Sequence, residues 1–119
     1  LGKNEGMIFP FDVEGYYNFW MMNVQFPLDL IWINSDKTII DITLNAQPCT
    51  VNCPTYTSKE KARYVLEVNG GFVSRNNIAV GAQVNFKLSE SIEKTGRQPR
   101  QGNNMRASSE YMSSLLGVA

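Results

Sequence analysis

Residues 17–33 constrain the fold of this chain more than any other segment, with the sequence YNFWMMNVQFPLDLIWI. Aromatic, methionine and aliphatic residues fill most of these positions, a density typical of the centre of a hydrophobic core. Residues 28–33 have the β-branched and aromatic content of a strand that is covered on both faces. We therefore expect the rest of the chain to be organised around a buried strand in this segment.

Several further elements are expected around that strand. The turn Asn34-Ser35-Asp36-Lys37 precedes residues 38–44, which alternate apolar and polar positions, and this pattern predicts a β-hairpin. Pro10 indicates that an apolar strand near the start lies at a sheet edge or ends there, because proline provides no N–H donor. The apolar patterns also predict strands at residues 62–68 and 83–88 and one or two helical turns at residues 72–76.

Length and charge restrict the classes of function. The chain has 119 residues with 43% hydrophobic content, which predicts one domain. Eleven basic and eleven acidic residues cancel, so we expect no nucleic-acid partner, and no apolar run is long enough to span a membrane.

The residue types also exclude familiar active sites. Histidine is absent, which removes Ser-His-Asp and Cys-His nucleophilic systems and zinc sites that use histidine. The chain contains no glycine-rich phosphate loop or dinucleotide fingerprint. We expect no cofactor and no metal.

Cys49 and Cys53 are the two cysteines of the chain. Their spacing allows a small disulfide loop or two reduced thiols in a turn, and it is one residue longer than the thioredoxin-type redox motif. If the disulfide forms, it favours a secreted or periplasmic location.

Asp29 and Glu67 are the best candidates for acid–base chemistry, because each places a carboxylate on an otherwise apolar strand. The alternative is that each accepts hydrogen bonds from loop backbone or pairs with Lys61 or Arg63.

A ligand site is a second hypothesis. Trp20, Tyr56 and Trp32 can form an aromatic wall for a sugar or another small molecule, with the amides of Asn23 and Asn69 as polar partners. The alternative is that these aromatic residues belong to the core, where strand aromatics are usually found.

The composition changes at Ser89. Residues 94–108 have almost no apolar content, and residues 109–116 have apolar side chains at helical spacing, which predicts a polar tail that ends in a short amphipathic helix. The tail residues expected to contact a partner are Arg97, Arg100, Met105, Tyr111, Met112, Leu115 and Leu116.

Several motifs occur in order along residues 5–88: EGMIF, FWMMN, PLDLIWI, ARYVLEVNGG and, at 78–81, IAVG. In these motifs the chain resembles the domain of unknown function 192 family of bacteria and archaea. The resemblance implies a compact, barrel-like, mostly antiparallel β domain at residues 1–88, which lacks the first strand and helix usual in the family. Residues 89–119 form an extension without a counterpart in the family, and the family has no settled activity.

A non-enzymatic subunit of a multi-chain assembly is the function that these features favour. Ordering a polar tail costs roughly 1–2 kcal/mol per residue in backbone entropy, which a partner surface can offset. A missing first strand leaves an open sheet edge for a partner strand. We expect an accessory protein of a phage particle, located in the virion and acting as a decoration or cement protein. The alternatives are a small-ligand module or a hydrolase-like enzyme that uses the surface of Trp20, Asn23, Asp29 and Glu67.

Overall fold

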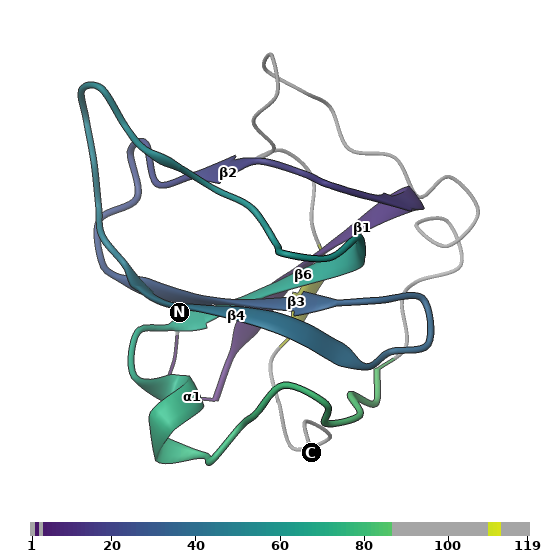
Figure 1. Ribbon diagram of the computed structural model, residues 1–119. Coiled ribbons are helices and arrows are strands. Elements are labelled where there is room, and N and C mark those ends of the chain that lie inside the picture. Colours follow the sequence, from purple (N-terminus) through teal and green to yellow (C-terminus); the bar gives the residue numbers. More distant parts are fainter. Residues whose placement is uncertain (1, 3, 87–109, 113–119) are drawn as a thin grey trace.

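A computed structural model describes residue 2, residues 4–86 and, as backbone alone, residues 110–112 (Figure 1). The main element is a five-stranded antiparallel sheet with the strand order β4-β3-β6-β1-β7. Its strands are β1 (Gly6–Gly15), β3 (Leu28–Ile33), β4 (Ile39–Ala46), β6 (Ala62–Asn69) and β7 (Glu110–Met112). The short strands β2 (Phe19–Trp20) and β5 (Thr55–Tyr56) pair with each other, and one helix, α1, spans Phe72–Arg75.

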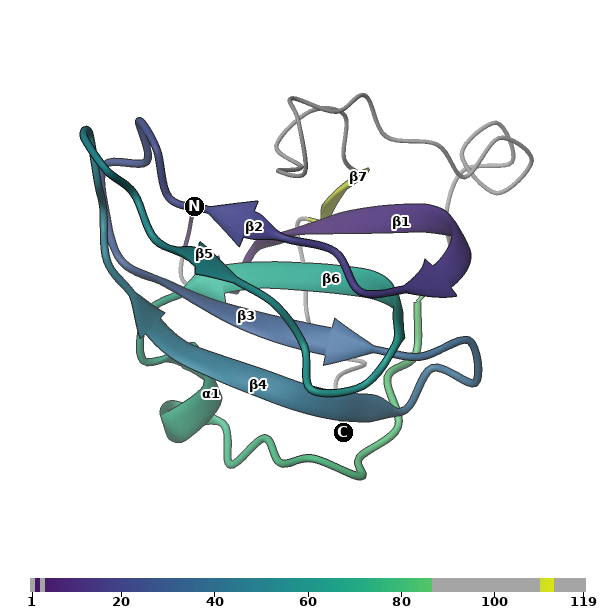
Figure 2. The ribbon, with the colours of Figure 1, turned by 45° about the horizontal axis from the view of Figure 1, so that its top comes forward.

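The short elements cover the two faces of the large sheet. Both ribbon views place β2 and β5 over one face, and α1 with the segment that follows it over the other (Figure 2). The expected mostly β, antiparallel fold is therefore confirmed. No helix in the described part of the chain is long and apolar enough to cross a membrane.

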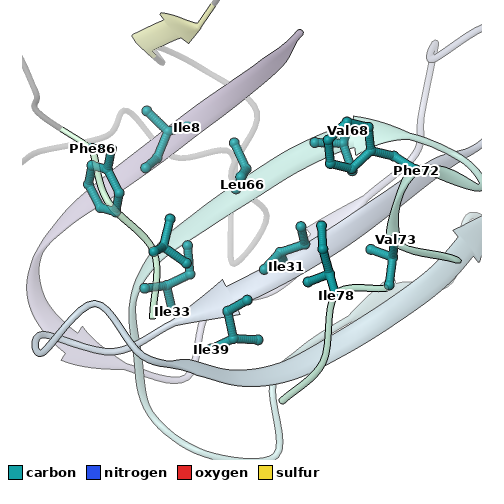
Figure 3. Close-up of a cluster of buried hydrophobic side chains, with 11 residues drawn as sticks. Ile8, Ile31, Ile33, Ile39, Leu66, Val68, Phe72, Val73, Ile78 and Phe86 are labelled. Atoms are coloured by element: carbon teal, nitrogen blue, oxygen red, sulfur yellow. The ribbon is translucent and has the colours of Figure 1, made fainter. Parts of the chain in front are cut away.

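Strand β3 lies inside the sheet, between β4 and β6, and all six of its residues are buried. Because strand side chains alternate between faces, β3 contributes to two separate cores. Leu30 and Trp32 belong to the core under β2 and β5. Ile31 and Ile33 belong to the core under α1, shown in Figure 3. The expected strand with two covered faces is confirmed.

The core under β2 and β5 is built around Phe19, which is fully buried. Its ring contacts those of Phe9 and Trp32 edge to face, with centroids 5.2 and 5.6 Å apart. Trp32 also donates its indole N–H to the Thr43 hydroxyl at 3.1 Å. Phe19 therefore joins the small sheet to the large one.

The hairpin between β3 and β4 also forms as expected. The Asn34 side-chain oxygen accepts the backbone N–H groups of Asp36 and Thr38, both at 3.0 Å. Lys37 takes a positive φ of 61°, which completes the reversal. Asparagine at the first turn position provides this internal hydrogen bonding.

Residues 83–86 do not form the expected strand. Within the described residues, Gln83 makes one isolated bridge to Thr38, and Val84 and Phe86 are buried under the sheet. The period-two apolar pattern therefore reflects burial of alternate side chains and not a strand of the sheet. Residues 87 and 88 lie outside the described part.

The prediction of an amphipathic helix at residues 109–116 is wrong for Glu110–Met112, which form strand β7. Tertiary pairing with β1 overrides the local helical pattern here, since an open sheet edge offers hydrogen-bond partners along the whole strand. The rest of that range lies outside the described residues, as do Arg97, Arg100, Met105, Leu115 and Leu116.

Replacing Phe19 with alanine tests the role of its ring in joining the two sheets. Phe19→Ala should lower the free energy of unfolding by about 3–5 kcal/mol, because it leaves a cavity in a close-packed core. Chemical denaturation followed by tryptophan fluorescence measures this change. Val80→Ala, at an exposed site, is the control and should change stability by less than about 0.5 kcal/mol. Equal losses in the two variants would contradict this role of Phe19.

Candidate functional site

The outer edge of β1 is the first candidate site. On one side β1 pairs with β6, and on the other it pairs with β7 in the register Gly6↔Met112, Met7↔Tyr111 and Ile8↔Glu110. Gly6 permits close strand packing, because a Cβ there would lie 2.8 Å from the Glu67 carbonyl oxygen. The described strand β7 spans three residues of β1, which places β1 inside the sheet there, and β1 continues past Pro10 to Gly15. The edge position expected for Pro10 stays a prediction.

Asp29 is a structural carboxylate. Its side chain is 1% exposed and accepts backbone N–H groups from Asn45 at 2.8 Å and from Gly71 and Val73 at 3.1 Å each. These bonds tie β3 to β4 and to the start of α1. Asp29 therefore accepts backbone hydrogen bonds, as the alternative expected, but its donors lie in β4 and at the start of α1 and not in a loop.

Glu67 is also buried, at 2% exposed, but on the opposite face of the sheet. It alternates with Leu66 and Val68, which belong to the core under α1, where the partners of Asp29 lie. The Glu67 side chain lies on the same face of the sheet as Val65, which belongs to the core under β2 and β5. The structure therefore does not bring the two candidate carboxylates together.

The expected aromatic wall does not assemble either. Trp32 is fully buried, whereas Trp20 and Tyr56 are half-buried on β2 and β5, where Tyr56 packs against the core under these strands. Asn23 is an exposed turn residue with φ 62°, and its backbone N–H donates to the Cys49 carbonyl at 3.1 Å. The alternative that these aromatic residues belong to the hydrophobic core is therefore confirmed for Trp32.

Cys49 and Cys53 form a disulfide, with their Cα atoms 5.5 Å apart. The Cys49 N–H donates to the Met21 carbonyl at 3.3 Å, so the loop that carries the disulfide is fixed to the segment after β2. Of the two states left open by the sequence, the disulfide is the one observed.

A pocket with both apolar and amide walls is the second candidate site. Leu28 at the start of β3 pairs with Ala46 of β4 and Asn69 of β6, which brings two distant asparagines to the same end of the sheet. An open pocket of about 360 Å³ lies there. Its walls are Phe26, Pro27, Asn45, Asn69 and Gly70. Sequence reasoning selected Asn69 but missed the other four, since nothing local to residues 26–27 or 45 indicates that they meet residues 69–70.

Comparison with known proteins identifies the family. The DUF192 family, described as Uncharacterized ACR, matches residues 1–86, and the chain belongs to it. No curated protein matches the chain at a significant level.

Two solved structures are similar to this chain. A candidate transcription regulator from Sinorhizobium meliloti 1021 is 38% identical with a TM-score of 0.61, over 66% of this chain and 59% of that protein. A protein of unknown function from Novosphingobium aromaticivorans DSM 12444 is 35% identical with a TM-score of 0.65, over 70% and 58% of the two chains. The similarity thus extends over less than two thirds of either relative.

Asp29→Asn tests the structural role of the carboxylate. The amide keeps one acceptor oxygen and places an NH₂ group beside buried N–H donors, so the free energy of unfolding should fall by about 2–4 kcal/mol. Urea denaturation measures the loss. Asp36→Asn, on the exposed hairpin turn, is the matched control and should stay within about 0.5 kcal/mol of the unmodified chain. An unchanged midpoint for Asp29→Asn would show that its three hydrogen bonds contribute nothing.

Proposed function

We propose that this chain is a non-enzymatic interaction subunit of a multi-chain assembly, and that neighbouring chains are joined by strand pairing at the outer edge of β1. The observation that carries this proposal is the antiparallel pairing of β7, from the chain's own C-terminal extension, with Gly6–Ile8. Addition of a strand to a sheet edge is a common way for proteins to bind an extended segment.

The described pairing of β7 with β1 supports an exchangeable contact. It covers three residues, and each backbone hydrogen bond adds a net stabilisation of only about 0.5–1.5 kcal/mol. A pairing of this size can open and reform without unfolding of the domain. Identical elements that pair within one chain can also pair between copies, which is domain swapping.

The position of β7 in the sequence supports the same proposal. Residues 87–109 separate β7 from the domain, and a segment of this length can extend to roughly 80 Å. Strand β7 can therefore reach the β1 edge of its own domain or the β1 edge of a neighbouring copy. Pairing within one chain is favoured in dilute solution, and exchange is favoured where copies are held close together.

The geometry of the carboxylates supports the non-enzymatic part of the proposal. Asp29 is engaged by three backbone N–H groups, and Glu67 faces the other core. A hydrolase that needs both carboxylates at one substrate has no support from this arrangement. The particular setting in a phage particle stays a prediction.

Cysteines at register partners test the exchange. We would prepare Met7→Cys and Tyr111→Cys as two separate chains, mix them under mild oxidation and analyse them on a non-reducing gel. Antiparallel partners lie about 4.5–5.5 Å apart at Cα, within the span of a disulfide. We expect a disulfide-linked heterodimer that increases with protein concentration, with the linked peptides identified by mass spectrometry because Cys49 and Cys53 are already paired.

Two controls complete this test. Gln25→Cys, at an exposed position, mixed with Tyr111→Cys should give no specific dimer. The double variant Met7→Cys with Tyr111→Cys should cross-link within a single chain. Cross-linking of the double variant together with a mixture that stays monomeric at all concentrations would contradict exchange between copies.

A further inference from the structure

Backbone hydrogen bonds connect the walls of the pocket at the start of β3. Its walls come from the loop before β3, the end of β4 and the turn after β6. Asp29 holds two of these walls, because one carboxylate oxygen accepts the Asn45 N–H and the other accepts the Gly71 N–H. The Gly70 N–H also donates to the Pro27 carbonyl at 3.0 Å. The pocket is therefore preorganised by backbone contacts that need no ligand.

Gly70 keeps the walls close together. A Cβ at this position would lie 3.0 Å from the Asn45 side-chain oxygen and 3.2 Å from the Pro27 Cβ. Asn45 has a positive φ of 54°, a conformation that asparagine tolerates better than most residues. This backbone places an asparagine side chain at the rim.

The chemistry of the walls indicates the class of ligand. None of the lining residues that the structure describes is charged, so the described walls have no group that selects for an ion. Among the described residues, the Asn45 side-chain amide has no hydrogen-bond partner, and it provides both a donor and an acceptor. Phe26 is 42% exposed, which leaves an aromatic surface at the rim.

We infer that this pocket binds a neutral monosaccharide, whose ring packs against Phe26 while its hydroxyls exchange hydrogen bonds with the Asn45 amide. Asn69, whose side-chain NH₂ donates to the Gly2 carbonyl at 3.2 Å, forms a neighbouring part of the wall. A ring hydroxyl both donates and accepts, as an amide group does, and the C–H face of a sugar ring fits an aromatic side chain. A volume of about 360 Å³ is at the small end of ligand pockets, which suits one ring. This inference does not depend on strand exchange at β1.

Side-chain amide resonances of the full-length chain test the inference directly. We would titrate ¹⁵N-labelled protein with glucose, galactose, mannose and N-acetylglucosamine. At least one of these sugars should produce saturable shifts of the Asn45 and Asn69 NH₂ signals, with a dissociation constant on the order of 1–10 mM for a small ligand in an open pocket. Cyclohexanol, a ring of similar size with a single hydroxyl, should produce much weaker shifts.

Two variants with matched controls locate the site. Phe26→Ala and Asn45→Gly should each weaken binding about fivefold or more, and glycine keeps the left-handed backbone available at position 45. The control for Phe26→Ala is Tyr16→Ala, which removes another exposed aromatic ring. The control for Asn45→Gly is Asn52→Gly, which replaces another asparagine with positive φ. Neither Tyr16 nor Asn52 is among the residues that line the pocket. Both controls should bind the sugar as the unmodified chain does.

Three results would overturn the inference. The first is the absence of saturable shifts at Asn45 and Asn69 with all four sugars in the unmodified chain. The second is an equal response to cyclohexanol, which would indicate nonspecific apolar binding. The third is unchanged affinity in Phe26→Ala and Asn45→Gly, which would place any binding elsewhere.

Discussion

The hydrogen bonds of the Asp29 carboxylate connect the parts of this structure that the chain order keeps apart. The residue lies on the interior strand β3, yet its oxygens accept N–H groups from the end of β4 and from the start of α1. A buried carboxylate is costly unless such bonds compensate for lost hydration. Because all three donors are backbone groups, Asp29 fixes the course of the chain and not the position of a few side chains. The Asn45 wall of the pocket at the start of β3 follows from these contacts, and the Gly70 wall is held by them together with the Gly70 N–H bond to the Pro27 carbonyl.

The two-faced burial of β3 explains why the domain has two cores. Leu30 and Trp32 face β2 and β5, whereas Ile31 and Ile33 face α1 and the segment after it. An interior strand must be covered on both sides, so even two-residue strands and a one-turn helix become necessary parts of the fold. The ring contacts of Phe19 with Phe9 and Trp32 keep the cover of one face in place.

Local signals were sufficient for the elements that depend on local chemistry. The buried strand at 28–33 followed from its composition, and the hairpin followed from Asn34, whose side chain does make the expected turn bonds. Residues 83–86 and 110–112 were assigned wrongly because strand formation depends on a partner that a periodic pattern does not reveal. The pocket was missed for a similar reason, since only the pairing register of β3 brings Asn45 and Asn69 to the same end of the sheet.

The account of function rests on the pairing of the C-terminal strand with β1. The most direct measurement is a search for backbone cross-strand nuclear Overhauser effects between residues 6–8 and 110–112 in the full-length chain. The account predicts contacts between the α-protons or amide protons of Met7 and Tyr111, together with slowed amide exchange at residues 110–112. Absence of these contacts, with fast exchange throughout residues 110–112, would contradict it.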